Sequence, residues 1–190
     1  IPVLCECGDD YRIDLNDFRK KIKKADAVLI SHMRGHTSDM DVIISECKQV
    51  KIPLIEDAAH SLGTTWHGNK IGTLGDAGCF SFQSYKMLNA GEGGIFVTDN
   101  AELFAKAVIM SGAYEHNWMK HQGEHASFKK WQNKLPLYNM RINNLSAAII
   151  RAQLPELNKR IEKGRHNHDF TAERLNRSPW ICVPEKLRPE

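Results

Sequence analysis

Residues 27–57 read AVLISHMRGHTSDMDVIISECKQVKIPLIED, and the architecture follows from this stretch. It opens with an apolar run over residues 27–31, which is typical of a strand buried on both faces of a sheet. A second apolar run, over residues 52–55, ends in Glu56 and Asp57. Two such runs around a helix-length segment predict a strand–helix–strand unit with a right-handed crossover.

The segment between the two runs has the pattern of an amphipathic helix. Ser38, with Asp41 three residues later, indicates a capped helix start. Apolar positions then recur at the spacing of one helix face: Met40, Ile43, Ile44 and Cys47. The chain is therefore expected to be an α/β protein.

The pattern continues downstream of this unit. Residues 79–82 and 95–98 read as strands joined by a Gly-rich segment. A helix is expected between Asn100, as its N-cap, and Gly112. Residues 113–138 show no period, and an irregular stretch of that length is usually functional or mobile.

The last third is expected to be helical. Leu145, Ala148, Ile149 and Ala152 mark a helix that Pro155 should interrupt or kink, after which an amphipathic pattern resumes. Residues 180–183 read as a final strand.

Composition narrows the class of protein. The chain has 190 residues, 42% of them hydrophobic, enough for one domain with a buried core. Its formal net charge of +3 is spread without a basic run, so neither nucleic acid nor an anionic membrane is expected as a partner. The five cysteines have irregular spacing, which favours a reducing cytoplasm over a disulfide framework. No apolar stretch reaches the roughly 18 residues of a membrane span, and the start, without Met and already strand-like, suggests a fragment.

Two residues stand where chemistry is expected. Asp57 ends a strand, and open α/β sheets bind ligands at the carboxyl ends of their strands; an N-cap for the following turn is the alternative. Lys86 follows another strand, with hydroxyls before it and glycines at 91–94 after it. A lysine amine becomes a nucleophile when burial or a nearby cation lowers its pKa from about 10.4. A surface lysine at a strand end is the alternative, and the order of residues does not match a Walker phosphate loop.

A metal site is the rival chemistry. His32 and His36 lie close together in sequence, and imidazole is a common zinc ligand. Further histidines in the irregular stretch could complete such a site: His116, His121 and His125. Cys5 and Cys7 have the wrong spacing for a zinc knuckle or a redox pair. No metal is expected on balance.

The order of several motifs resembles one family. Glu56-Asp57-Ala58-Ala59-His60 is followed by Gly75-Asp76-Ala77-Gly78-Cys79-Phe80-Ser81-Phe82 and then by Lys86 with Gly91-Glu92-Gly93-Gly94. Upstream stand residues 31–36 with 39–41, and downstream Asn139-Met140-Arg141, Ala147-Ala148 and Gln153-Leu154. Together they resemble the DegT/DnrJ/EryC1/StrS aminotransferases, fold-type I pyridoxal-phosphate (PLP) enzymes that act on keto sugars and related cyclic ketones.

The resemblance implies a fold, domain boundaries and the parts of the family's fold that this sequence does not include. We expect a three-layer α/β/α arrangement with a mostly parallel central sheet, the large domain of fold-type I PLP enzymes, in incomplete form. Residues 1–178 would be a partial PLP-binding large domain with its connecting helix, and residues 179–190 the start of the C-terminal small domain. The family's phosphate-binding Gly-Thr helix start and its ring-stacking residue would lie upstream of residue 1.

The resemblance also implies roles for single residues. Lys86 would form the Schiff base with PLP, and Asp57 would pair with the pyridine nitrogen and keep it protonated. His60 would lie near the ring and its phenolic oxygen, and Ser81 would hydrogen-bond the phosphate. Asn139 would reach the phosphate in the neighbouring subunit, which implies a homodimer with shared active sites; a turn residue is the alternative.

The implied activity is transamination in amino sugar biosynthesis. Glutamate or glutamine would donate the amino group, and a nucleotide-linked keto sugar or a cyclitol ketone would accept it. A related branch that dehydrates sugars has His in place of the lysine, so Lys86 favours transamination. Residues 113–138 would cover the substrate or form a surface loop. The alternative function is that of a non-catalytic or truncated PLP-fold protein with a regulatory or assembly role.

Overall fold

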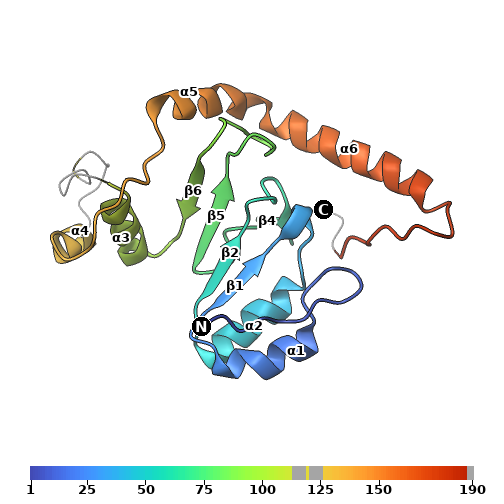
Figure 1. Cartoon of the computed structure of the whole chain (residues 1–190), viewed down its shortest axis with the longest axis horizontal. Coiled ribbons are helices and arrows are strands. Elements are labelled where there is room, and N and C mark those ends of the chain that lie inside the picture. The colour runs from blue at the N-terminus through green and yellow to red at the C-terminus, as the bar shows by residue number, and fades with distance from the viewer. Residues whose placement is uncertain (113–118, 120–125, 188–190) are drawn as a thin grey trace.

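The central element of the computed structural model is a four-stranded sheet (Figure 1). The structure describes residues 1–112, 119 and 126–187. The strands are β1 (Val28–Ser31), β2 (Leu54–Asp57), β5 (Ala77–Ser81) and β6 (Gly94–Val97), in the order β1-β2-β5-β6. β1, β2 and β5 run parallel, and β6 is antiparallel to β5. The predicted α/β class with a mostly parallel sheet is confirmed.

Helices flank the sheet in three places (Figure 1). α1 (Leu15–Lys21) and α2 (Met40–Val50) pack on β1 and β2, while α3 (Ala101–Ser111) and α4 (Ala126–Trp131) lie beyond β6. α5 (Asn144–Gln153) and α6 (Leu157–Leu175) run past the carboxyl end of β5. A small antiparallel hairpin, β3 (Thr65–Trp66) with β4 (Asn69–Lys70), and 3-10 turns at Ile22–Lys24, Met33–Gly35 and Leu154–Glu156 complete the described elements.

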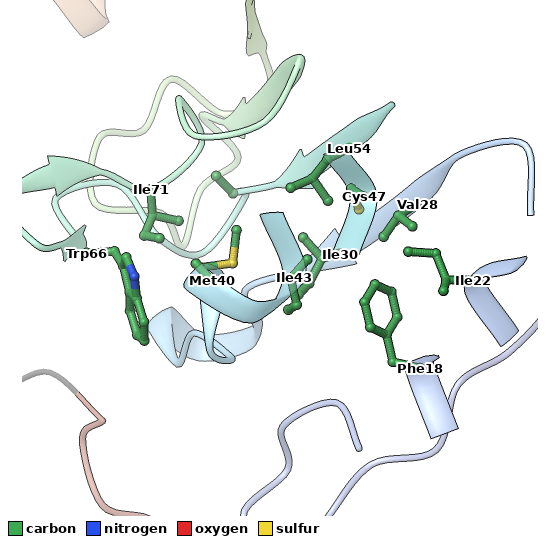
Figure 2. Close-up of a cluster of buried hydrophobic side chains, with 11 residues drawn as sticks. Phe18, Ile22, Val28, Ile30, Met40, Ile43, Cys47, Leu54, Trp66 and Ile71 are labelled. Atoms are coloured by element: carbon green, nitrogen blue, oxygen red, sulfur yellow. The ribbon is translucent and has the colours of Figure 1, made fainter. Parts of the chain in front are cut away.

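The main core lies between β1, β2 and the two helices α1 and α2. Phe18 of α1, Ile43 of α2 and Ile30 of β1 belong to this core, and Ile43 lies beside Ile30 (Figure 2). The buried members are Phe18, Ile22, Val28, Ile30, Met40, Ile43, Cys47, Leu54, Ala58, Trp66 and Ile71. Three of the four predicted apolar positions of α2 are thus fully buried, and the fourth, Ile44, packs at the rim.

The helix cap differs from the prediction by one residue. Asp39 is the N-cap of α2, and its carboxylate accepts the Val42 N–H at 3.2 Å. Ser38 instead accepts the Ile13 N–H at 3.2 Å. The cap falls on Asp39 because it is the residue immediately before the first helical position, where a side-chain oxygen reaches the free N–H groups.

Burial of β1 also differs from the prediction. Val28 and Ile30 are buried, whereas Leu29 is 68% exposed and Ser31 is exposed. Successive strand residues point to opposite faces. In the described residues α1 and α2 cover only one face of β1, so the expectation of burial on both faces is wrong.

After residue 100, the predicted helices are confirmed, but the predicted irregular stretch and the predicted last strand differ from the structure. Asn100 caps α3, which ends at Gly112, and Pro155 lies in the 3-10 turn that separates α5 from α6, as predicted. Inside the stretch expected to be irregular, residues 126–131 form α4, where Phe128 packs edge-on against Phe104 of α3. Residues 180–183 form no strand.

A buried arginine ties the ends of the described chain together. Arg12 donates to the carbonyl oxygen of Thr37 at 2.8 Å and to Asp10 at 3.1 Å, and it also donates to the carbonyl oxygen of Glu185. The segment after α6 therefore returns to the turn that precedes α2. None of the described helices has the length and apolar character that would let it cross a membrane.

Candidate functional site

Two predicted site residues end neighbouring parallel strands. Asp57 is the last residue of β2 and Ser81 the last of β5, so both lie at the carboxyl edge of the sheet. Asp57 pairs in register with Cys79, which places Ser81 two residues further along and on the same face. From strand spacing the two Cα atoms are roughly 8 Å apart.

The carboxylate of Asp57 is held on both oxygens. Ser31, its register partner in β1, donates its hydroxyl to Oδ2 at 2.9 Å. The N–H of Ala59 donates to Oδ1 at 3.1 Å. Each oxygen keeps a further lone pair, so the group can still accept a hydrogen bond from a ligand.

A second acid lies directly beneath, on the buried face of the same strands. Glu56 and His32 have fully buried side chains, and His32 Nε2 lies 3.1 Å from Glu56 Oε2. Three backbone N–H groups of the 72–75 segment donate to Glu56 at 2.6 to 2.8 Å. Burial by itself raises the pKa of Glu56, but the hydrogen bonds from His32 and from these N–H groups outweigh it and leave the pKa below its ordinary value.

The turn after β2 carries His60. Its Nδ1 accepts the Arg34 N–H at 3.3 Å and lies 3.2 Å from Met33 Sδ. In a neutral ring the proton is then on Nε2, which can donate to a ligand. Ser61 donates to the carbonyl oxygen of His32 at 2.9 Å, so the turns after β1 and β2 are joined.

Lys86 lies in a closed loop that leaves β5. Phe82 N–H donates to the carbonyl oxygen of Gly93, and Ala90 N–H donates to that of Phe82, so the loop begins and ends at one place. Gly93 has a φ of 146°, a backbone conformation that L side chains rarely adopt. Lys86 is half-buried, and its amine makes no hydrogen bond or ion pair with any described residue.

Helices α5 and α6 fix this loop from outside. The side chain of Gln153 bonds both backbone groups of Asn89, at 2.6 Å from Nε2 and 3.3 Å to Oε1. Arg160 donates to the carbonyl oxygen of Met87 at 3.1 Å and to Gln153 at 2.8 Å. The position of Lys86 thus depends on two polar residues of the later helices.

Asn139 lies in the segment between α4 and α5. It is exposed, and the N–H groups on either side of it, those of Tyr138 and Met140, donate to carbonyl oxygens at the end of α3. Within the described chain no hydrogen bond links it to Asp57, Ser81 or Lys86. The structure therefore places four of the five predicted site residues at or beyond the carboxyl ends of β2 and β5, and the fifth, Asn139, in the segment between α4 and α5.

The rival metal site finds no support in the described residues. They contain no group of three or more His, Cys, Asp or Glu side chains placed to hold a metal ion. His32 is engaged with Glu56. Burial, and then the nearby Arg12 and His168, lower the pKa of His36. His116, His121 and His125 lie outside the described residues.

Three polar residues of the site carry no role in the sequence-based prediction: Ser31, Gln153 and Arg160. Ser31 could have been found from the strand register, because both strands end at one edge and Ser31 lies opposite Asp57. The contacts of Gln153 and Arg160 join segments more than 60 residues apart, and no local pattern predicts them.

Comparison with known proteins shows the family to which the chain belongs. The model of the DegT/DnrJ/EryC1/StrS aminotransferase family matches residues 1–188. The chain belongs to this family. GDP-perosamine synthase of Vibrio cholerae is 35% identical over 167 residues, which are 87% of this chain and 43% of that protein. 3-Amino-5-hydroxybenzoate synthase of Amycolatopsis mediterranei (strain S699) is 35% identical over 131 residues, 68% of this chain and 32% of that protein.

Solved structures show the same fold. 3-Amino-5-hydroxybenzoic acid synthase superposes with a TM-score of 0.78 at 25% identity, over 97% of this chain and 47% of that one. GDP-4-keto-6-deoxy-D-mannose-3-dehydratase of E. coli, solved with bound hydrated PLP, superposes with a TM-score of 0.78 at 26% identity, over 94% of this chain and 48% of that one. The chain thus spans less than half the length of these relatives.

Proposed function

We propose that the protein is a PLP-dependent aminotransferase that transfers an amino group from glutamate or glutamine to a nucleotide-linked keto sugar or a cyclitol ketone. The observation that carries this proposal is the doubly held carboxylate of Asp57 at the carboxyl edge, with Ser81 on the next strand and Lys86 in the loop beyond. Relatives named as a GDP-perosamine synthase and as a putative L-glutamine:3-amino-2,3-dideoxy-scyllo-inosose aminotransferase support the substrate class.

The residues at this edge suit PLP in their chemistry. The ring nitrogen needs an ionised acceptor, which Asp57 supplies with its remaining lone pairs. The phosphate needs donors, and the hydroxyl of Ser81 is one. The aldehyde needs an amine, and Lys86 offers one without a competing partner among the described residues. The roughly 8 Å between the Cα atoms of Asp57 and Ser81 is a span that a pyridine ring with its phosphate arm can bridge.

Each of these side chains would then have a defined role in the transamination. PLP, when bound, supplies an electron sink for the bond broken at the donor's Cα. Lys86 would hold the cofactor through its amine and, once displaced by a donor, would carry the proton from the donor's Cα to C4′ of the cofactor. Asp57 keeps the proton on the ring nitrogen, His60 donates from Nε2 to the phenolic oxygen, and Ser81 donates to the phosphate.

The assembly and location belong to the same proposal. Asn139, exposed and without a hydrogen bond to Lys86 in the described chain, would serve the site of a second copy in a homodimer. α5 presents an exposed apolar stripe for that copy: Leu145, Ala148, Ile149 and Ala152. Residues 1–178 would be the large domain and residues 179–190 the start of the small one. The five free cysteines support a cytoplasmic location, and the dispersed charge supports a protein without nucleic-acid or membrane partners.

The test is a visible spectrum of the protein supplied with PLP, before and after addition of glutamate or glutamine. The wild type and Lys163→Ala, a change at an exposed lysine of α6, should show a Lys86-dependent band that shifts with the donor. Lys86→Ala should lack it. A band that survives in Lys86→Ala contradicts the assignment of the lysine. PLP binding without a response to any donor would favour the non-catalytic alternative.

A further inference from the structure

We infer that Ser31 is a positioning residue for Asp57, whose carboxylate it holds in the orientation that receives the ring nitrogen of the cofactor. This role rests on the proposed function and adds to it a residue that does not need to touch the cofactor. The observation behind it is the hydrogen bond from Ser31 Oγ to Asp57 Oδ2 at 2.9 Å.

The backbone beneath this bond is fixed. Ser31 and Asp57 are register partners at the last rung of the β1–β2 ladder. Just beyond it, His32 N–H donates to the carbonyl oxygen of Asp57 at 3.0 Å. The buried pair of His32 and Glu56 holds the opposite face of the same two strands. With the backbone held in this way, the orientation of the carboxylate depends on rotation of the two side chains.

That rotation matters because the outer dihedral of an aspartate is soft. The χ2 angle of Asp has a broad, roughly two-fold distribution, so one hydrogen bond to one oxygen does not set the carboxylate plane. Ala59 N–H holds Oδ1, and Ser31 holds Oδ2. With both donors in place the plane is set before a ligand arrives, and less ordering is needed on binding.

Replacement of Ser31 should therefore affect only interactions that pass through Asp57. Ser31→Ala leaves Oδ2 without its donor and lets the carboxylate turn about the remaining bond to Ala59. Ser31→Thr keeps the hydroxyl on a β-branched side chain, which suits a strand. Ser45→Ala, at an exposed position of α2, is the matched control for loss of a serine hydroxyl.

The experiment measures the dissociation constants of PLP and of a deaza analogue in which C–H replaces the ring nitrogen. We expect Ser31→Ala to weaken PLP binding about tenfold, the scale of one hydrogen bond to a charged group. Binding of the analogue, which cannot pair with Asp57 through a ring N–H, should stay unchanged. Ser31→Thr and Ser45→Ala should bind both ligands as the wild type does.

Other outcomes distinguish failure of the role of Ser31 from failure of the proposed function. Equal losses for PLP and the analogue in Ser31→Ala would show a general structural role and overturn the inference. Unchanged PLP binding in Ser31→Ala would overturn it as well, while the proposed function stands. If the wild type binds neither ligand in its full-length chain, the proposed function fails and the role of Ser31 fails with it.

Discussion

Glu56 shows how one buried side chain can support a site that it does not enter. Its carboxylate accepts from His32 and from three N–H groups of the 72–75 segment, with no solvent contact. Because Asp57 follows it on the opposite face of β2, any shift of Glu56 moves the base of the site. A buried acid is stable in this place only while all its partners remain.

We expect Glu56→Gln to lower the free energy of unfolding by about 3 kcal/mol, because the amide turns one acceptor atom into a donor that faces other donors. Urea denaturation at pH 7 measures the loss. Glu162→Gln, at an exposed position of α6, should change stability by less than about 0.5 kcal/mol. A Glu56→Gln protein as stable as this control would contradict the role given to the buried acid.

The same residue predicts a pH dependence. The pKa of Glu56 is lowered in the folded protein, so its contribution to stability is present above the unfolded-state value of about 4.3 and is lost as the pH falls through the folded-state value. Below about pH 4.5 the wild type should therefore lose stability more steeply than Glu56→Gln. Parallel curves for the two proteins between pH 3 and pH 7 would show that Glu56 titrates alike in both states.

At the scale of helices and strands, the sequence predicted those elements that are stabilised by contacts within one stretch of the chain. The strand–helix–strand unit over residues 27–57 was predictable because its periodicity and its core are contained in one stretch. α4 was not, since its six residues gain stability from Phe128 against α3, a contact that no spacing reveals. Residues 180–183 have strand composition but no strand partner among the described residues.

Some residues of the candidate site were likewise predictable from the sequence, and others were not. Asp57, Ser81 and Lys86 could be placed from strand ends and motif order. Ser31 could not be assigned a role without the register, because its effect depends on which residue lies opposite it in the neighbouring strand. The contact of Gln153 with the Lys86 loop could not be predicted, because a periodic pattern does not show where α5 lies in the fold.

Two glycines at the contact of α6 should respond in opposite ways to the same substitution. Gly164 lies within the helix, and a Cβ there would meet only Met87 Cε at 3.9 Å. Gly164→Ala should raise the free energy of unfolding by up to about 1 kcal/mol through helix propensity. Gly63 has a φ of 97°, and a Cβ there would come within 2.5 Å of Ile161 Cδ1.

Gly63→Ala should therefore lower stability by about 1 to 3 kcal/mol, through backbone strain and overpacking against α6. Thermal denaturation of the two variants beside the wild type measures both signs in one experiment. Equal shifts of the two melting temperatures would contradict the packing of α6 on the turn at Gly63.

For the whole molecule, the position of Asn139 makes a prediction about assembly. Its neighbours in sequence bond to the end of α3, and within the described chain no hydrogen bond joins Asn139 to Asp57 or Lys86. The exposed apolar stripe of α5 follows shortly after it in the chain. If a second copy covers this stripe, Asn139 of one copy can serve the site of the other.

Mixing of two inactive variants tests this arrangement. Lys86→Ala removes the amine, and Asn139→Asp adds a negative charge where a phosphate would bind, so neither homodimer should show the donor-sensitive band. After unfolding and refolding together, a mixed dimer has one site with both Lys86 and Asn139 intact. About a quarter of all sites should then respond to the donor, given random pairing of copies related by two-fold symmetry. If both residues serve the same copy's site, no mixed dimer contains an intact site, and mixing restores nothing.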